Sequence, residues 1–258
     1  MLSEPMLTDL LRDAGLDAPV RFEERTGSTQ ETARALAEAG APAWTLVATA
    51  HQVAGRGREG RSWSDAPGAL LCSVVLRPAL AAPAGGVVPL LAGAAMAEAC
   101  EEVAAGSAVV TCRWPNDLLL DGGKLGGMLA ESQLDGDRIA WIVLGIGVNV
   151  VAPPADVPEA RALGAGDAAT LLGAFLRRLP AMLEGDPVAA VRARYVPRCA
   201  TLGRRVRART AAGVVEGEAV AIRDDGALVV ATRDGERAVT SGEVLHMEKD
   251  TGASPDAR

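Results

Sequence analysis

The chain has 258 residues, of which 49% are hydrophobic and 23% charged, and its formal net charge at pH 7 is -7. This size and composition predict a globular protein with one substantial core and a small satellite domain, and the acidic balance argues against general binding to nucleic acid. The sequence contains no apolar run long enough to span a membrane, and its N-terminal stretch carries acidic residues where a secretory leader needs a basic start. We therefore expect a cytoplasmic protein with no membrane or nucleic-acid partner.

A helix is predicted near the start of the core. Ser28 or Thr29 can cap it, Glu31 stands three residues after Ser28 as in a capping box, and an alanine-rich stretch continues as far as Gly40. The residues before Arg21 are assigned to an N-terminal extension, 1–20.

An arginine-rich loop follows. Two apolar segments, residues 44–50 and 68–78, are expected to form core strands, and the sequence VAGRGREGRSW connects them. Its glycines allow the backbone to approach a ligand closely, while Arg56, Arg58 and Arg61 offer donors that match carboxylate or phosphate oxygens. The loop is therefore predicted to bind a small anion, and a solvated surface hairpin remains the alternative that spacing alone leaves open.

The middle of the chain predicts a helix and an antiparallel meander. Residues 85–105 form a small-residue apolar stretch that indicates a buried helix, and three apolar runs separated by Asp-Gly turns follow at 108–120, 123–134 and 138–150. Helices before and between such strands predict an α+β fold, with a mixed, mainly antiparallel sheet and helices on one face.

The sequence pattern changes within the last third of the chain. Residues 167–200 have a helical pattern in which Asp167 and Asp186 are the expected N-caps. Beyond Leu202, short alternating segments separated by glycine turns predict a small barrel, and residues 249–258 are expected to be a disordered tail.

The cysteines predict no metal site. All four stand far apart without a CxxC pair, and only two histidines accompany them. We expect them to be reduced core residues, and we assign no metal ligands. They are Cys72, Cys100, Cys112 and Cys199.

Three further segments carry polar residues in unusual places. In RWPNDLLL, the Trp-Pro pair interrupts a strand and exposes Asn116 and Asp117, which could hold a sugar, an amide or hydrated Mg²⁺, or could form a simple Asx turn. Lys124 stands between two glycine pairs, where it can reach a ligand or be a solvated turn residue. In GIGVN, residues 145–149, two glycines within a core strand predict a close neighbour.

In this order and spacing, the segments GST, HQVAGRGREGRSW, RWPND, GKLGGMLAE and GIGVN strongly resemble the biotin protein ligases. The resemblance runs over residues 21–247. It implies a class II synthetase-like catalytic domain at 21–201 and an SH3-like barrel at 202–248. Two positions depart from the family pattern, since Gln30 stands where asparagine is usual and Arg113 where lysine is usual.

The resemblance implies a function. Biotin and ATP, with Mg²⁺ held mainly by phosphates, would give biotinyl-5′-adenylate, and the biotin would pass to a lysine of a biotin carboxyl carrier domain. The alternatives are a lipoate or octanoate ligase and a non-catalytic biotin sensor. Because only about twenty residues precede Arg21, we do not expect the transcriptional repression of members with a DNA-binding domain. Whether the protein is a homodimer is left open.

The resemblance also implies roles for individual residues. Within the loop, Arg56 is expected at the biotin carboxylate or α-phosphate and Arg58 at the departing phosphates. The catalytic residues would be Lys124, Arg56 and Arg58. The biotin-binding residues would be Ser28, Thr29, Gln30, Gln52, Gly55, Arg56, Gly57, Arg58, Lys124, Gly126 and Gly127. The ATP-binding residues would be Arg58, Arg61, Trp63, Asn116, Asp117 and Asn149, with Trp63 covering the adenine.

Overall fold

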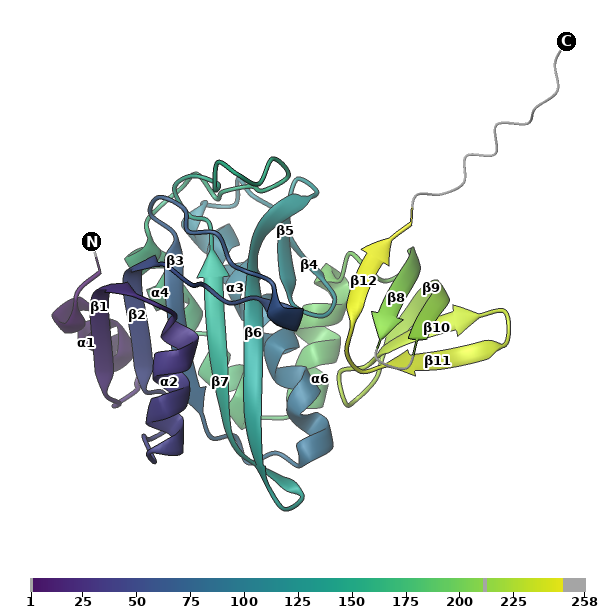
Figure 1. Cartoon of the computed structure of the whole chain (residues 1–258), viewed down its shortest axis with the longest axis horizontal. Coiled ribbons are helices and arrows are strands. Elements are labelled where there is room, and N and C mark those ends of the chain that lie inside the picture. Colours follow the sequence, from purple (N-terminus) through teal and green to yellow (C-terminus); the bar gives the residue numbers. More distant parts are fainter. Residues whose placement is uncertain (1, 211–212, 248–258) are drawn as a thin grey trace, which may run out of the picture.

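The computed structural model describes residues 2–210 and 213–247, which form two sheets (Figure 1). The larger sheet contains β1 (Val20–Thr26), β2 (Leu46–Gln52), β3 (Leu70–Leu76), β4 (Val110–Arg113), β5 (Asp117–Leu120), β6 (Gly123–Asp135) and β7 (Arg138–Val148). The smaller sheet contains β8 (Arg205–Thr210), β9 (Gly213–Ile222), β10 (Leu228–Thr232), β11 (Gly235–Val239) and β12 (Glu243–His246). The tail expected to be disordered, residues 249–258, lies outside the described residues.

The strands of the larger sheet lie in the order β1-β2-β3-β7-β6-β5-β4. β1 pairs in parallel with β2, and the other neighbouring pairs are antiparallel. The predicted meander is confirmed, because β4, β5, β6 and β7 pair in the order in which they follow along the chain. The α+β fold with a mixed, mainly antiparallel sheet is likewise confirmed.

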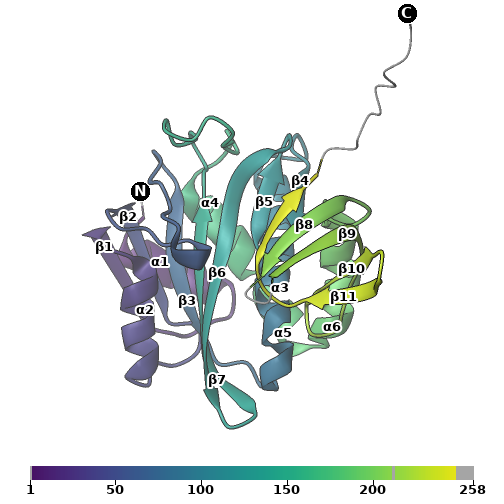
Figure 2. The same ribbon diagram turned by 45° about the vertical axis from the view of Figure 1, so that its right-hand side comes forward.

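Most helices lie on one face of this sheet (Figures 1 and 2). They are α1 (Glu4–Asp13), α3 (Val87–Val103), α4 (Ala168–Leu176), α5 (Leu179–Glu184) and α6 (Pro187–Ala190), followed by two short turns, η3 (Val191–Tyr195) and η4 (Val196–Arg198). The exception among the described helices is α2 (Thr29–Glu38), which covers the opposite face. Its Ala33 and Ala37 pack there against Val47, Val75 and Trp141.

α3 is the central helix of the core. Almost its whole surface is apolar and built from small residues, which lets it lie close against the sheet. By length and composition alone the stretch Ala82–Val103, which also includes the turn η2 (Ala82–Gly86), could cross a membrane, but most of it is buried inside the protein. We therefore assign α3 to the core, as the sequence predicts for residues 85–105.

The N-terminal residues, predicted to be only an extension of the catalytic domain, contribute to its core. α1 buries Leu7 and Leu11, which belong to the main apolar cluster, and Glu4 accepts a hydrogen bond from the backbone N–H of Phe22 at 3.1 Å. β1 begins at Val20 and forms an edge of the sheet. Its half-exposed burial pattern, with charged residues in the middle, explains why no strand was predicted there.

The predicted helix caps are correct at two of three positions. Asp167 accepts a hydrogen bond from the backbone N–H of Thr170, and Asp186 accepts from the N–H groups of Val188 and Ala189. Ser28 occupies the N-cap position of α2, but its side chain makes no capping hydrogen bond. The hydroxyl is buried and has no partner in the described part of the chain. The capping box is therefore wrong, and this hydroxyl is available for another role.

The small sheet packs against the end of the large sheet that carries β4 and β5 (Figure 2). All of its neighbouring strands are antiparallel. Buried Trp114, in the turn between β4 and β5, donates from its indole N–H to the carbonyl of Gly226 at 2.9 Å and from its backbone N–H to the hydroxyl of Thr201 at 3.0 Å. The turn that bears Asn116 and Asp117 is thus anchored on the small barrel.

Candidate active site

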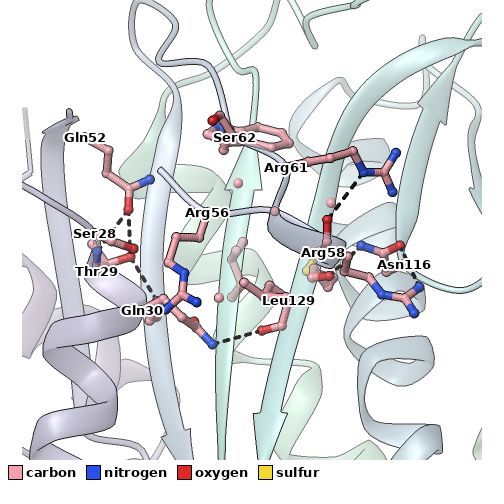
Figure 3. Close-up of a pocket in the computed structure, with 18 of the residues that line it drawn as sticks. Ser28, Thr29, Gln30, Gln52, Arg56, Arg58, Arg61, Ser62, Asn116 and Leu129 are labelled. Carbon is pink, nitrogen blue, oxygen red and sulfur yellow. Dashed lines mark hydrogen bonds between the residues drawn. The ribbon is translucent and has the colours of Figure 1, made fainter. Parts of the chain in front are cut away.

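One cavity collects most of the predicted site residues (Figure 3). It lies over the centre of the sheet, on the same face as α2, between the start of α2 and the arginine loop. The predicted residues that line it are Ser28, Thr29, Gln30, Gln52, Arg56, Gly57, Arg58, Arg61, Trp63, Asn116, Asp117, Lys124 and Gly127. Gly55, Gly126 and Asn149 are not in the lining.

One end of the cavity is polar and uncharged. The side-chain carbonyl of Gln52 accepts a hydrogen bond from the backbone N–H of Thr29 at 2.9 Å, and the Thr29 hydroxyl lies 2.9 Å from that of Ser73. The unpartnered hydroxyl of Ser28 lies in the same lining. Donors and acceptors held on a strand and a helix terminus suit a ligand that presents both kinds of group.

The other end is charged. Asp117 accepts from Lys124 at 2.8 Å and from the guanidinium of Arg113 at 2.6 Å. Burial opposes the charge on Asp117, but Lys124 and Arg113 outweigh it and hold the pKa of the carboxyl below its usual range. Asp117 therefore stays ionised and fixes the Lys124 ammonium beside the cavity. Arg113, which departs from the family pattern, keeps a cation at this position.

The arginine loop folds as a hairpin over the cavity. The backbone N–H of Gly57 donates to the carbonyl of Arg61 at 2.7 Å, and that of Trp63 donates to Gly55 at 2.9 Å. At the tip, η1 (Arg58–Gly60) contains Glu59 with φ 56°, a left-handed conformation that is uncommon for a residue other than glycine. Because the backbone leaves the extended conformation at this tip, side chains no longer alternate between the two faces of the hairpin. The arginines of the loop therefore point in different directions (Figure 3).

The loop arginines Arg56 and Arg58 have different surroundings from each other. Arg58 lies 3.5 Å from the side-chain oxygen of Asn116, and burial lowers its pKa from the ordinary value, opposed by the charges of Glu59 and Asp117. Arg56 lies 3.6 Å from Glu31 and 3.8 Å from Glu131. The structure thus places Arg58, and not Arg56, next to the charged end.

Trp63 fills part of the cavity. A Cβ atom added at Gly147 would lie 2.7 Å from its ring, so the glycine of GIGVN makes room for the indole. Lys124 Nζ lies 5.6 Å from the ring centroid, and the indole N–H is buried without a partner among the described residues. The close neighbours expected at the two glycines of this strand are therefore Trp63 at Gly147 and Gln30 at Gly145.

The cavity is smaller than the ligands that the sequence resemblance implies. Its volume is about 110 Å³, whereas ligand sites usually enclose roughly 300–1,000 Å³. If biotin and ATP bind here, as the resemblance implies, we expect Trp63 and the hairpin to shift so that both can enter. We expect residues 53–63 to exchange amide hydrogens readily in the free protein and to be protected when both substrates are present. Hydrogen exchange measured on this segment, with α3 as the internal reference, checks it, and equal protection in both states contradicts a moving loop.

Several lining residues were not predicted. Cys72, Ser73, Leu129 and Ile146 reach the cavity from neighbouring strands. Only the pairing of β3, β7 and β6 brings these positions together, so no local sequence signal marks Ser73. Asn149 is buried, and its amide donates to the carbonyl of Arg161 at 3.0 Å, while its side-chain oxygen has no partner among the described residues.

The side chains that line the cavity could hold Mg²⁺ only loosely. No group of three His, Cys, Asp or Glu side chains suited to a metal occurs in residues 2–210 and 213–247. Asp117 lines the cavity, and both of its oxygens already pair with cations. Such a site suits a hydrated ion held mainly by substrate phosphates, with Asp117 and Asn116 as the nearby oxygen donors.

Comparison with known families agrees with this geometry. Residues 22–149 match the biotin/lipoate A/B protein ligase family, and residues 201–247 match the biotin protein ligase C-terminal domain. The fold and the cavity thus define a ligase of the biotin and lipoate class.

Relatives over nearly the full length narrow the class. The chain is 35% identical to the biotin--[acetyl-CoA-carboxylase] ligase of Mycobacterium tuberculosis, covering 95% of this chain and 96% of that protein. It is 32% identical to the bifunctional ligase/repressor BirA of Bacillus subtilis, covering 94% and 78%. The biotin protein ligase of Aquifex aeolicus, solved in complex with biotin and ATP, superposes with a TM-score of 0.71 at 25% identity, covering 88% of this chain and 97% of that one. This chain belongs to the biotin protein ligase family, and its larger sheet has the expected class II synthetase-like fold.

Proposed function

We propose that the chain is an ATP-dependent ligase that activates biotin as biotinyl-5′-adenylate and transfers it to a lysine of a biotin carboxyl carrier domain. The observation that carries this proposal is the two-ended cavity. Its uncharged polar end, with Ser28, Thr29 and Gln52, faces a charged end with Lys124 and Arg58. A ligand with a polar ring at one end and a carboxylate at the other matches both ends.

The first half-reaction joins two anions. The biotin carboxylate oxygen attacks the α-phosphorus of ATP, the bond from that phosphorus to the bridging oxygen breaks, and pyrophosphate leaves. Lys124, fixed by Asp117, would hold the carboxylate against the α-phosphate. Arg58 would neutralise the charge that develops on the phosphate oxygens. When bound, Mg²⁺ supplies further charge neutralisation on the phosphates.

The second half-reaction releases AMP. The neutral amine of the acceptor lysine attacks the carbonyl carbon of the mixed anhydride, an amide bond forms, and the bond to the phosphate oxygen breaks. The amine proton passes to solvent. Trp63 and the hairpin would cover the adenylate until the carrier arrives, which protects the anhydride from water.

The partner and the setting of the reaction follow from the same proposal. A carrier domain of acetyl-CoA carboxylase or a related carboxylase would present its lysine at the mouth of the cavity, in the cytoplasm. The catalytic domain would extend over residues 21–201 and the SH3-like barrel over 202–248. The N-terminal residues 1–20 add α1 to the core of the catalytic domain.

One assay distinguishes a biotin ligase from the two alternatives, a lipoate ligase and a non-catalytic biotin sensor. The purified protein is incubated with ATP, Mg²⁺ and either biotin or lipoate, and pyrophosphate release and label transfer to a carrier domain are measured. We expect both signals with biotin and neither with lipoate, because an acyl chain without a ureido ring leaves the polar end unpaired. Signals with lipoate alone would indicate a lipoate ligase, and biotin binding with neither signal would indicate a sensor.

A further inference from the structure

A line of hydrogen bonds leads from the polar end of the cavity into the protein. The hydroxyls of Thr29 and Ser73 lie 2.9 Å apart, and the Ser73 hydroxyl donates to the side-chain oxygen of Gln30 at 3.2 Å. The Gln30 amide nitrogen donates to Glu131 at 3.2 Å and to the backbone carbonyl of Val143 at 3.1 Å. Gln30 and Ser73 are almost completely buried. Figure 3 shows Gln30 below Thr29, with its amide directed away from Gln52.

This line has a fixed direction. The carboxylate of Glu131 and the carbonyl of Val143 only accept hydrogen bonds, so the amide nitrogen of Gln30 must face them and its oxygen must face Ser73. Ser73 uses its single proton on that oxygen. The Thr29 hydroxyl has one proton and two acceptors within reach, Ser73 at 2.9 Å and the side-chain oxygen of Gln52 at 3.3 Å. Because Ser73 donates to Gln30, the shorter contact between the two hydroxyls is made with Thr29 as the donor, and the Thr29 oxygen keeps its lone pairs for the cavity.

Gln52 is oriented in the same way beside it. Its side-chain oxygen accepts the backbone N–H of Thr29 at 2.9 Å, which leaves its amide nitrogen to donate to a ligand. The cavity thus presents an acceptor at Thr29 next to a donor at Gln52. A cyclic urea offers the complementary N–H and C=O along one edge.

We propose that Gln30 and Ser73 are positioning residues that lock the Thr29 hydroxyl as an acceptor for a ureido N–H. This rests on the proposed function, because it requires biotin to occupy this cavity. Although Gln30 lines the cavity, both polar atoms of its side chain have protein partners, so we expect it to act through Thr29. This gives a reason for the departure from asparagine at this position. The longer side chain reaches β6 and β7, and a Cβ atom added at Gly145 would lie 2.5 Å from its oxygen.

The test compares biotin with a biotin N-methylated on the ureido ring. In Gln30→Met and Ser73→Ala the line is broken and the Thr29 hydroxyl can rotate. We expect the KM for biotin to rise about tenfold in each variant, with kcat and the KM for ATP within about twofold of wild type. The N-methylated analogue does not use this acceptor, so its affinity, measured by calorimetry, should change little. The preference of the protein for biotin over the analogue should then fall about tenfold.

The double variant and a control make the test decisive. Because both substitutions break one line, Gln30→Met/Ser73→Ala should be no worse than either single variant. Thr49→Ala removes another buried hydroxyl, which donates to the carbonyl of Glu23 at 2.7 Å outside the line, and should leave the preference unchanged. Additive losses, or an unchanged preference in the variants, overturn the proposal. Failure of the wild-type protein to bind biotin would instead overturn the proposed function.

Discussion

Replacing Lys124 with alanine is expected to slow the formation of biotinyl-adenylate at least about a hundredfold, the scale of losing one well-placed charged donor in a transition state. The ammonium lies 2.8 Å from Asp117 and on the edge of the cavity, between glycines that leave the approach open. No other lysine occurs among the described residues, and the neighbouring cations Arg113 and Arg58 already lie beside Asp117 and Asn116. Single-turnover release of pyrophosphate, with biotin and ATP saturating, measures the effect.

The fold should survive this substitution. Asp117 remains bonded to Arg113 at 2.6 Å, and the Lys124 side chain is partly exposed, so its ion pair contributes about 1 kcal/mol or less to stability. Lys124→Arg is the matched control, since it keeps the charge and changes the geometry. Its rate should lie between those of the wild type and the alanine variant. Adenylate formation by Lys124→Ala near the wild-type rate would remove Lys124 from the mechanism.

The sequence predicts those features of the site that depend on neighbouring residues. The loop arginines, the Asn116-Asp117 turn and Lys124 each stand in a short segment whose glycine, proline or charge pattern indicates its chemistry. α3 and the meander are predictable for the same reason, because a period or a turn signal lies within a short window. The family resemblance then predicts that these segments meet in one site.

Features that depend on strand pairing are not predictable in this way. Ser73 enters the site because β3 lies beside β7, and its sequence context is that of any buried strand. The buried hydroxyl of Ser28 has the pattern of a helix cap, and only the fold shows that it makes no capping bond. α1 and β1 are short and partly exposed, so tertiary packing, and not local propensity, determines them.

The surroundings of Arg56 and Arg58 are likewise not predictable from the local sequence, although both residues stand in one loop. Sequence order places Arg56 nearer to Gln52 and therefore nearer to the expected carboxylate. The left-handed Glu59 at the tip turns the hairpin, however, and brings Arg58 to Asn116. Arg56 is left beside Glu31 and Glu131, with its side chain partly exposed. We therefore propose that Arg58, and not Arg56, makes the closer contact with the reacting phosphate.

Replacing Arg58 with alanine is expected to slow adenylate formation about a hundredfold and to speed the escape of the adenylate by about tenfold or more. A charge-assisted hydrogen bond to a buried group is worth roughly 1.5–3 kcal/mol, which is about tenfold to a hundredfold in rate or retention. Arg58 is the more buried of the two arginines and shares its surroundings with Asp117. Both the transition state and the bound adenylate should therefore lose a contact.

Arg56→Ala is the matched control, because it removes the same side chain from the same hairpin. Arg56 contacts carboxylates at 3.6 and 3.8 Å, and these exposed pairs contribute little, so its loss should change both rates by less than about tenfold. Single-turnover adenylation and the off-rate of labelled adenylate, measured for both variants, decide the order. A larger defect in Arg56→Ala would restore the assignment made from the sequence. Equal defects would mean that the hairpin acts only as a positive cover, because the distinct surroundings of the two guanidinium groups would then have no catalytic consequence.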